Sequence, residues 1–364
     1  MTPRSTLVLL GCGLLLVVAA IWLASQRHLE HATMAADLVL PGLERSVATV
    51  TEVDLRRGDG THTSLKKEST GWTVAERGWP ADTGKVRKLL LDLGALNVVE
   101  EKTRLPANYP QLGVEDVSTP KATGTAVEVV TPARRYALIV GHNSSGKSGY
   151  VRVAGTAPTL LAAPLLTPDA DPKTWLERAL VDVPEARVRE VQMKPAEGPS
   201  YAATREKKEQ TDFSVSPLPK GRQLTGPGAA DSIAASLGSL SLDDVQKAAA
   251  PANTRLSHAV FRTFDGLELD VAGRKDGTRS LIALAARSTD PATADEAQRL
   301  NARLNGWEFE VPDYKYSALF RPLDELLQRP PEKEKVKPAR AAKKAGAAGS
   351  AAPAPGTAEP AAPH

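Results

Sequence analysis

Hydrophobic and polar residues alternate along several short segments of the chain, which is the pattern of half-buried β-strands. The segments are "TAVEVVT", "RYALIVG" and "GYVRVAG", followed later by "SHAVFRTF", "LELDVAG" and "SLIALAA". These strands come in groups around one main helix each, whereas a parallel sheet would need strands and helices in alternation. The pattern therefore predicts an α+β fold with antiparallel sheets.

Helical spacing of apolar residues marks the main helix of the first strand group. Asp82 has the side chain of a good N-cap, and one apolar face follows it, made of Val86, Leu89, Leu90, Leu93 and Leu96. In the second group Ile233, Leu237 and Leu240 continue such a stripe, but Gly238 interrupts it. We therefore expect one long helix and one weaker helix, each packed on its strands.

The chain repeats this order of elements, because the stretch from Gly71 to Glu100 resembles the stretch from Asp212 to Gln246. Each stretch has an aromatic-x-Val strand, a loop with proline, an aspartate before a helix, and a Val-containing strand. Helix-like segments, "DPKTWLERAL" and "SALFRPLDELL", follow later. This similarity predicts two related α+β repeats over residues 49–183 and 184–329, joined near residues 182–185.

The N-terminal residues 7–24 form an uncharged apolar run that is long enough for a membrane span. As a helix the run measures about 27 Å, against about 30 Å for the hydrocarbon core. A cleaved signal peptide is the alternative, although its apolar region has about 7–15 residues. We expect a retained transmembrane helix, with a cytoplasmic stub at 1–6, a juxtamembrane segment at 25–48, and the body in the periplasm of a bacterial inner-membrane protein.

Composition excludes several classes of protein. Lys and Arg number 46 and Asp and Glu number 43, so the basic surplus of a nucleic-acid-binding protein is missing. The only cysteine, Cys12, lies in the apolar run, so the body has neither a disulfide nor a cysteine metal site. Residues 330–364 are rich in Lys, Ala and Pro, which predicts a disordered tail.

The stretch "GHNSSGKS", Gly141 to Ser148, matches the phosphate-binding P-loop pattern. A P-loop needs a helix directly after the glycine-rich turn, because the helix N-terminus holds the phosphates. Here Gly149 and the strand-like "YVRVAG" follow instead. We therefore expect a β-hairpin loop with Lys147 in water, and no bound nucleotide.

The remaining candidate residues do not form a site. The histidines are His28, His31, His62, His142, His258 and His364, and only the first two are close in sequence, without a cysteine or second carboxylate nearby. Asp243 and Asp244 are expected in a solvated polar turn. Trp72, Trp79, Trp175 and Trp307 are expected to be core anchors, with a binding groove as the alternative. We predict no catalytic, cofactor-binding or metal-binding residues and no cofactor.

An ordered set of motifs resembles the bacterial family called domain of unknown function 4340. The set consists of Trp72-x-Val74, Pro80-Ala81-Asp82, the Leu89/Leu90/Leu93/Leu96 helix, "YPQLGVED", "ALIVG" and "GYVRV". The resemblance covers about residues 50–327 and implies an N-terminally anchored envelope protein, associated with ABC transport systems of the gliding-motility type. It also implies that Gly141 is a structural glycine, and it implies no catalytic residues.

The leading hypothesis is a non-enzymatic accessory protein that is anchored in the inner membrane and binds an ABC transporter permease or other envelope proteins. The principal alternative is a periplasmic ligand-binding or sensing domain that uses a cleft between the two repeats. An envelope hydrolase is a third hypothesis, and no nucleophile motif supports it.

Overall fold

The computed structural model describes residues 37–144, 146–249 and 256–328. The predicted stub at 1–6, the predicted transmembrane helix at 7–24, residues 25–36 of the juxtamembrane segment and the tail at 330–364 lie outside these residues. Within the described ranges, no helix has both the length and the apolar character that a membrane crossing requires.

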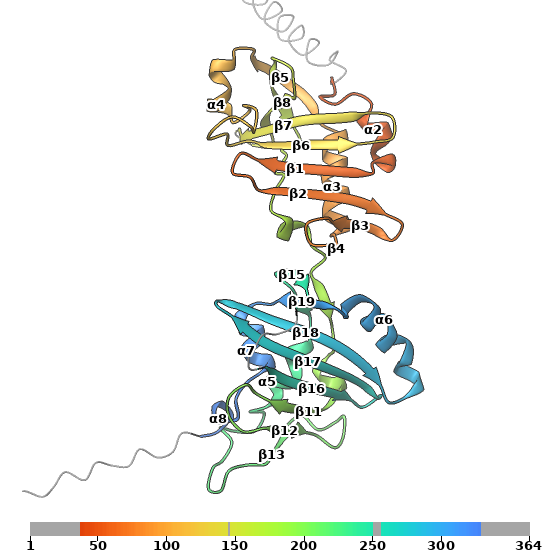
Figure 1. The fold of residues 1–364 in the computed structure, drawn as a ribbon, viewed down its shortest axis with the longest axis vertical. Coiled ribbons are helices and arrows are strands. Elements are labelled where there is room, and N and C mark those ends of the chain that lie inside the picture. The colour runs from red at the N-terminus through yellow and green to blue at the C-terminus, as the bar shows by residue number, and fades with distance from the viewer. Residues whose placement is uncertain (1–36, 145, 250–255, 329–364) are drawn as a thin grey trace, which may run out of the picture.

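The first nine strands form one antiparallel sheet, which with its helices we call the first half (Figure 1). The order across this sheet is β4-β3-β2-β1-β6-β7-β8-β9-β5. The strands are β1 (Glu52–Arg57), β2 (His62–Glu68), β3 (Gly71–Val74), β4 (Trp79–Pro80), β5 (Asn97–Thr103), β6 (Thr125–Val130), β7 (Arg135–Asn143), β8 (Gly149–Val153) and β9 (Thr159–Ala163).

Helix α3 (Thr83–Gly94) covers one face of this sheet and confirms the predicted long helix. The Asp82 side chain accepts a hydrogen bond from the Lys85 backbone N–H at 3.0 Å, as an N-cap should. The predicted stripe is buried against the strands, and the short helix α2 (Leu43–Ser46) packs beside α3. The helix α4 (Tyr109–Leu112) lies in the connection from β5 to β6.

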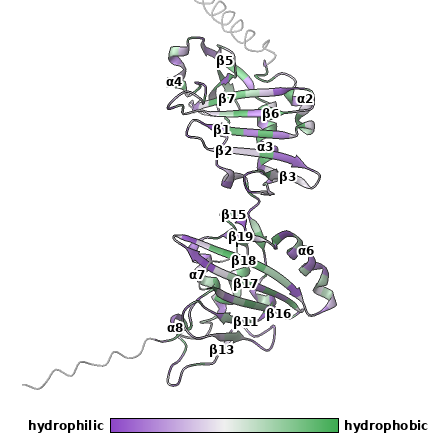
Figure 2. Ribbon diagram, viewed as in Figure 1, coloured by the Kyte–Doolittle hydropathy of each residue, from purple (hydrophilic) through white to green (hydrophobic). Residues whose placement is uncertain are grey.

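Eight later strands form a second antiparallel sheet, which with its helices we call the second half. Its order is β13-β12-β11-β16-β17-β18-β19-β15. The strands are β11 (Val188–Lys194), β12 (Tyr201–Thr204), β13 (Ser214–Ser216), β15 (Asp244–Lys247), β16 (Ser257–Thr263), β17 (Leu267–Asp276), β18 (Arg279–Ser288) and β19 (Trp307–Glu310). Strands such as β18 carry both hydrophobic and hydrophilic residues (Figure 2). This is expected for a sheet that buries one face and exposes the other.

The two sheets have the same strand order when each strand is matched to its counterpart in the other half. The matched pairs are β3 with β13, β2 with β12, β1 with β11, β6 with β16, β7 with β17, β8 with β18, β9 with β19, and β5 with β15. Among the described strands of these two sheets, only β4 has no counterpart, and β10 and β14 form a separate two-stranded sheet. The antiparallel α+β class is thus as expected, and the resemblance between the two parts of the sequence extends to their topology.

Two expectations about helices were wrong in part, and one helix was not expected. The second main helix is only α5 (Asp231–Ala234) and a 3₁₀ turn at Ala235–Leu237, because the chain turns at Gly238 and enters the two-residue strand β14 (Leu240–Ser241). The segment "DPKTWLERAL" contains a 3₁₀ turn and strand β10 (Ala179–Val181) in place of a helix. The amphipathic helix α6 (Ala294–Leu304) was not expected.

The last predicted helical segment, "SALFRPLDELL", is confirmed as two helices. They are α7 (Asp313–Leu319) and α8 (Leu323–Leu326), which are separated at Pro322. Proline lacks the backbone N–H that a continuous helix needs, so the break is expected there.

The halves follow one another along the longest axis of the molecule (Figure 1). The edge of the first sheet formed by β3 and β4 faces the edge of the second sheet formed by β15 and β19. Strands β5 and β13 form the two outer ends. Residues that connect the halves therefore lie on β4, β15, β19 and the linking segment, and we refer to this region as the joint.

Candidate functional site at the joint

Aromatic side chains from both halves meet at the joint. The Trp79 ring, from β4, is fully buried and lies edge-on to Trp307 and Phe309 of β19, with centroid distances of 5.3 and 5.1 Å. The guanidinium of Arg303, from α6, lies over the Trp79 ring, and the Trp79 indole N–H donates to the Glu177 carbonyl at 3.0 Å. A side chain of the first half is thus packed into the second half.

The chain that links the halves is held by backbone hydrogen bonds on both sides. On the first-half side, the Glu177 N–H donates to the Pro80 carbonyl at 2.9 Å. On the second-half side, the Leu242 N–H donates to the Arg178 carbonyl at 2.9 Å, and β10 pairs with β14. The link therefore belongs to the ordered structure and does not behave as a flexible linker.

A buried carboxylate, Asp244, binds two cations from the first half. Arg77, in the turn between β3 and β4, donates from Nε to Oδ1 at 2.6 Å and from Nη2 to Oδ2 at 3.2 Å. The Lys173 ammonium lies 3.3 Å from Oδ2. Burial raises the pKa of Asp244, but hydrogen bonds from Arg77 and from the Val245 N–H outweigh it, so that this pKa is lower than usual.

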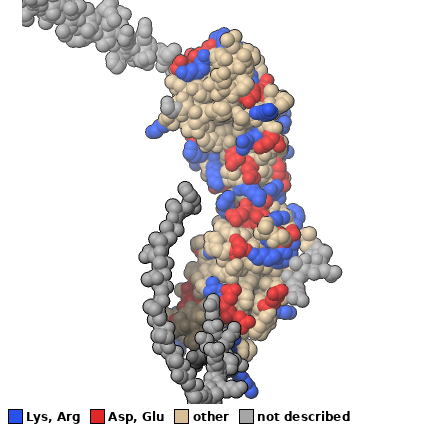
Figure 3. Space-filling model, turned by 90° about the vertical axis from the view of Figure 1, so that its left-hand side faces the viewer, with Lys and Arg blue, Asp and Glu red and all other residues tan. Residues whose placement is uncertain are grey.

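The same residues line a cleft of about 590 Å³ between the halves. Figure 3 shows acidic and basic side chains gathered around the narrow region between the two bodies. The lining consists of Glu76, Arg77, Lys173, Asp244, Val245, Gln246, Lys247, Arg279 and Glu310.

Most charges along this lining are paired within the protein. The Arg279 guanidinium donates to Glu310 at 2.7 Å and to the side-chain amide oxygen (Oε1) of Gln246 at 3.0 Å. The Gln246 amide donates to Glu308, which also accepts two bonds from Arg274. Hydrogen bonds from Arg274 lower the pKa of Glu308. These pairs join strands of the second half and keep its edge in place.

Lys247 differs from the other cations of the cleft, because its ammonium lies 3.4 Å from the centroid of the Trp307 ring. This cation–π contact leaves donors of the ammonium directed away from the ring. The arrangement can accept an anionic group beside an aromatic wall. As for metals, no group of three or more His, Cys, Asp or Glu within the described residues could hold an ion.

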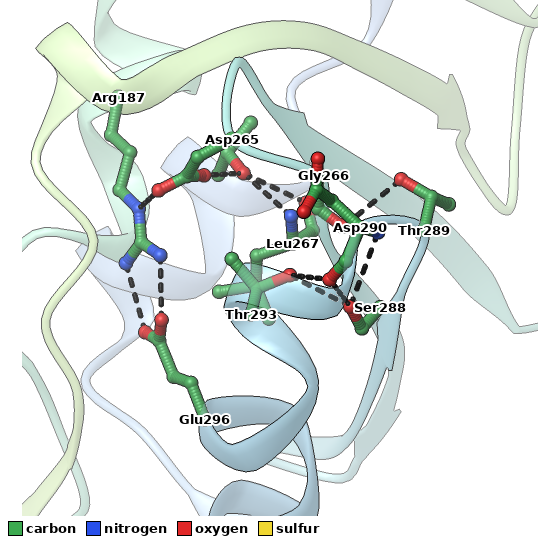
Figure 4. A network of polar contacts seen from close by, with 10 residues as sticks. Arg187, Asp265, Gly266, Leu267, Ser288, Thr289, Asp290, Thr293 and Glu296 are labelled. Atoms are coloured by element: carbon green, nitrogen blue, oxygen red, sulfur yellow. Dashed lines mark hydrogen bonds and ion pairs between the residues drawn. The ribbon is translucent and has the colours of Figure 1, made fainter.

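A second polar cluster joins α6 to the sheet of the second half (Figure 4). Arg187, before β11, donates to Asp265 at 2.7 Å and with both terminal nitrogens to Glu296 at 2.8 and 2.6 Å. Hydrogen bonds from Arg187 lower the pKa of Glu296. The Ser288 and Thr293 hydroxyls continue the network. Its charges are mutually satisfied, so we assign it to holding α6 on β17 and β18.

The P-loop-like stretch is a β-hairpin, as expected. Strands β7 and β8 pair in antiparallel fashion, with Asn143 opposite Gly149, and the Ser144 N–H donates to the Ser148 carbonyl at 3.0 Å. Lys147 is exposed. Gly141 faces the turn that follows α4, where an added Cβ would lie 2.1 Å from the Leu112 carbonyl oxygen. This glycine therefore permits a close backbone contact.

The tryptophans and aspartates occupy places that the sequence only partly indicated. Trp72, Trp79 and Trp175 are buried, which confirms them as core anchors, and Trp307 is half-buried at the joint. The expectation that Asp244 is solvated was wrong, because strand β15 carries it against Arg77. Asp243 is partly exposed, 4.0 Å from Arg178.

The histidines within the described residues are separate from one another. His62 lies 3.2 Å from Glu76, His142 bonds to the Thr123 hydroxyl at 3.0 Å, and His258 lies 3.7 Å from Asp270. His28, His31 and His364 lie outside the described residues.

Comparison with known families gives one match. The family model described as "Domain of unknown function (DUF4340)" matches residues 72–258, from β3 to the start of β16. This range includes Trp79, Arg77 and Asp244, and so includes most of the joint. No curated protein and no solved structure matches the chain.

Proposed function

For this chain, which belongs to the DUF4340 family of unknown function, we propose the role of a non-enzymatic accessory protein. It is anchored in the bacterial inner membrane, and its body lies in the periplasm. Its task is to hold the second half at a fixed distance from the membrane, for contact with an ABC transporter permease or another envelope protein. The apolar run at residues 7–24 supports the anchor.

One observation carries this proposal: the charged and aromatic side chains that converge between the halves mainly bind one another. Arg77, Lys173 and Asp244 connect the halves electrostatically, and Trp79 connects them by packing. Because bending would expose the buried Trp79 ring to water and break the two charge-assisted hydrogen bonds between Arg77 and Asp244, the joint resists bending. With strands about 4.8 Å apart, nine and eight strands in sequence make a body on the order of 80 Å long.

The test compares the intact protein with a variant in which residues 7–24 are replaced by a cleavable signal sequence. We expect the intact protein to stay in membranes after alkaline carbonate extraction and to copurify with a permease. The variant should be released in soluble form and should lose the permease. Copurification that is unaffected by release from the membrane would contradict the proposed role of the anchor.

The cleft supports a second candidate function, binding of a small anionic ligand in the periplasm. The observation that favours it is the Lys247 ammonium over Trp307 beside a volume of about 590 Å³. The soluble variant should then show saturable binding of a small carboxylate or phosphate compound, detected by tryptophan fluorescence. Loss of that binding in Lys247→Ala, with normal folding, would identify the cleft as the site.

A further inference from the structure

The outer end of the first half has exposed apolar side chains. The described residues include five exposed large hydrophobic residues, and three of them, Leu91, Val99 and Leu105, come from the stretch 91–105. Val99 is 55% exposed on β5, and Leu105, two residues after the end of that strand, is 64% exposed. Strand β5 is the outermost strand of the sheet, at the end farthest from the joint (Figure 1).

Val99 lies at a β-bulge of the edge strand and faces away from the core. Strand β5 pairs with β9 through Val98 opposite Ala162 and Glu100 opposite Leu161, so that Val99 has no partner across the ladder. Val98 packs against the core, and because successive side chains of a strand point to opposite faces, Val99 points to the surface. The exposure of Val99 is therefore built into the strand.

The chain enters the fold at this same end. Leu38 pairs with Asn97 at the start of β5, and the Val98 N–H donates to the Asp37 carbonyl at 2.9 Å. The apolar run ends at Ala24, so residues 25–36 separate it from Asp37. Twelve residues reach at most roughly 40 Å even when fully extended. An anchored chain therefore keeps the β5 end within roughly 40 Å of the bilayer, whereas the second half lies beyond it.

We propose that the β5 end of the first half rests on the lipid surface, with Val99 and Leu105 inserted at the boundary of the acyl chains. This inference rests on the proposed membrane anchor. The second half, with β13 at its outer end, points away from the membrane.

Lipid fits this surface better than a protein partner does. A stable protein interface buries about 800 Å² on each side, whereas two aliphatic side chains supply far less. A bilayer needs no matching shape, and the tether gives the contact a high effective concentration. The nearby charges form internal pairs, Lys102 with Glu100 and Arg104 with Glu101. Anionic lipid is therefore not required.

The test uses the full chain in phosphatidylcholine liposomes, with Cys12→Ser to remove the only cysteine. A polarity-sensitive fluorophore is attached to Leu105→Cys, and quenching by doxyl groups on the lipid acyl chains is measured. Leu218→Cys is the matched control, because Leu218 is also apolar and 40% exposed but follows β13 at the opposite end. We expect at least twofold quenching at position 105 and none at position 218.

A second variant tests the two apolar side chains directly. The label is moved to the exposed Ala107, and Val99→Asp and Leu105→Asp are introduced together. Because both substitutions are on the surface, folding should be unchanged, and the quenching at position 107 should be lost.

Three other outcomes would overturn the proposal. Equal signals at positions 105 and 218 in an anchored chain overturn the lipid contact alone. Extraction of the chain by carbonate overturns the anchor and the contact together. A label at position 105 that is shielded in native membranes, but not quenched in protein-free liposomes, overturns the contact in favour of a protein partner.

Discussion

Replacement of Arg77 by methionine should weaken the joint in a measurable way. Methionine keeps much of the side-chain volume but removes both hydrogen bonds to Asp244. The Asp244 carboxylate then remains in a place where only 9% of its side chain is exposed, with Lys173 as its remaining charged partner. The change thus isolates the electrostatic part of the contact between the halves.

The size of the effect follows from the burial of the two partners. Loss of one partner from a fully buried ion pair costs about 3–5 kcal/mol. Arg77 is 27% exposed and Lys173 still neutralises part of the charge, so we expect about 2 kcal/mol for Arg77→Met. Asp244→Asn leaves a guanidinium that water can reach and should cost about 1 kcal/mol. The double variant should show a coupling of about 1.5 kcal/mol.

The assay is urea unfolding of the chain that is released from the membrane by a cleavable signal, followed by tryptophan fluorescence. The control pair is Arg135 and Glu128, which form a 2.7 Å ion pair on the exposed surface of the first sheet. We expect no coupling there beyond experimental error. A coupling between Arg77 and Asp244 that is no larger than in the control would refute the view that this pair holds the halves together.

Three further predictions concern single positions. Gly141→Ala should destabilise the protein by about 2–3 kcal/mol, because the new Cβ overlaps the Leu112 carbonyl, whereas Gly226→Ala, in open space, should have little effect on the melting temperature. The lowered pKa of Asp244 contributes stability above the unfolded pKa, about 3.9, and this contribution is lost as the pH falls through the folded pKa. The difference in melting temperature between the wild type and Asp244→Asn should therefore shrink below about pH 4. Lys147→Ala should leave the melting temperature unchanged, because Lys147 is exposed in the hairpin of β7 and β8. If the wild type bound ATP and Lys147→Ala did not, the interpretation of this stretch as a simple hairpin loop would be contradicted.

Elements that depend on local signals could be predicted from the sequence. The apolar spacing after Asp82 identified α3, and the alternation on either side of "GHNSSGKS" identified the hairpin of β7 and β8. The second main helix was predicted too long, because its apolar stripe also includes Leu240, which belongs to a strand. Periodicity alone does not separate a short helix from a turn that leads into a strand.

The joint could not be predicted, because it depends on contacts between residues far apart in the sequence. Arg77 and Asp244 are 167 positions apart, and each is an ordinary polar residue within its own segment. The sequence suggested a solvated turn at Asp244, since burial of this carboxylate requires the edge of the other sheet. Trp79 and Trp307 were recognised as anchors, but their mutual contact follows only from the way in which the halves meet.

The most direct test of the fixed joint is the distance distribution between spin labels on the two halves, measured by pulsed electron paramagnetic resonance. The labels are placed at the exposed Glu68→Cys and Ala294→Cys, with Cys12→Ser. A fixed joint gives one narrow distribution, which becomes broad when Arg77→Met and Trp79→Ala are added. A broad distribution in the protein with an intact joint would contradict it.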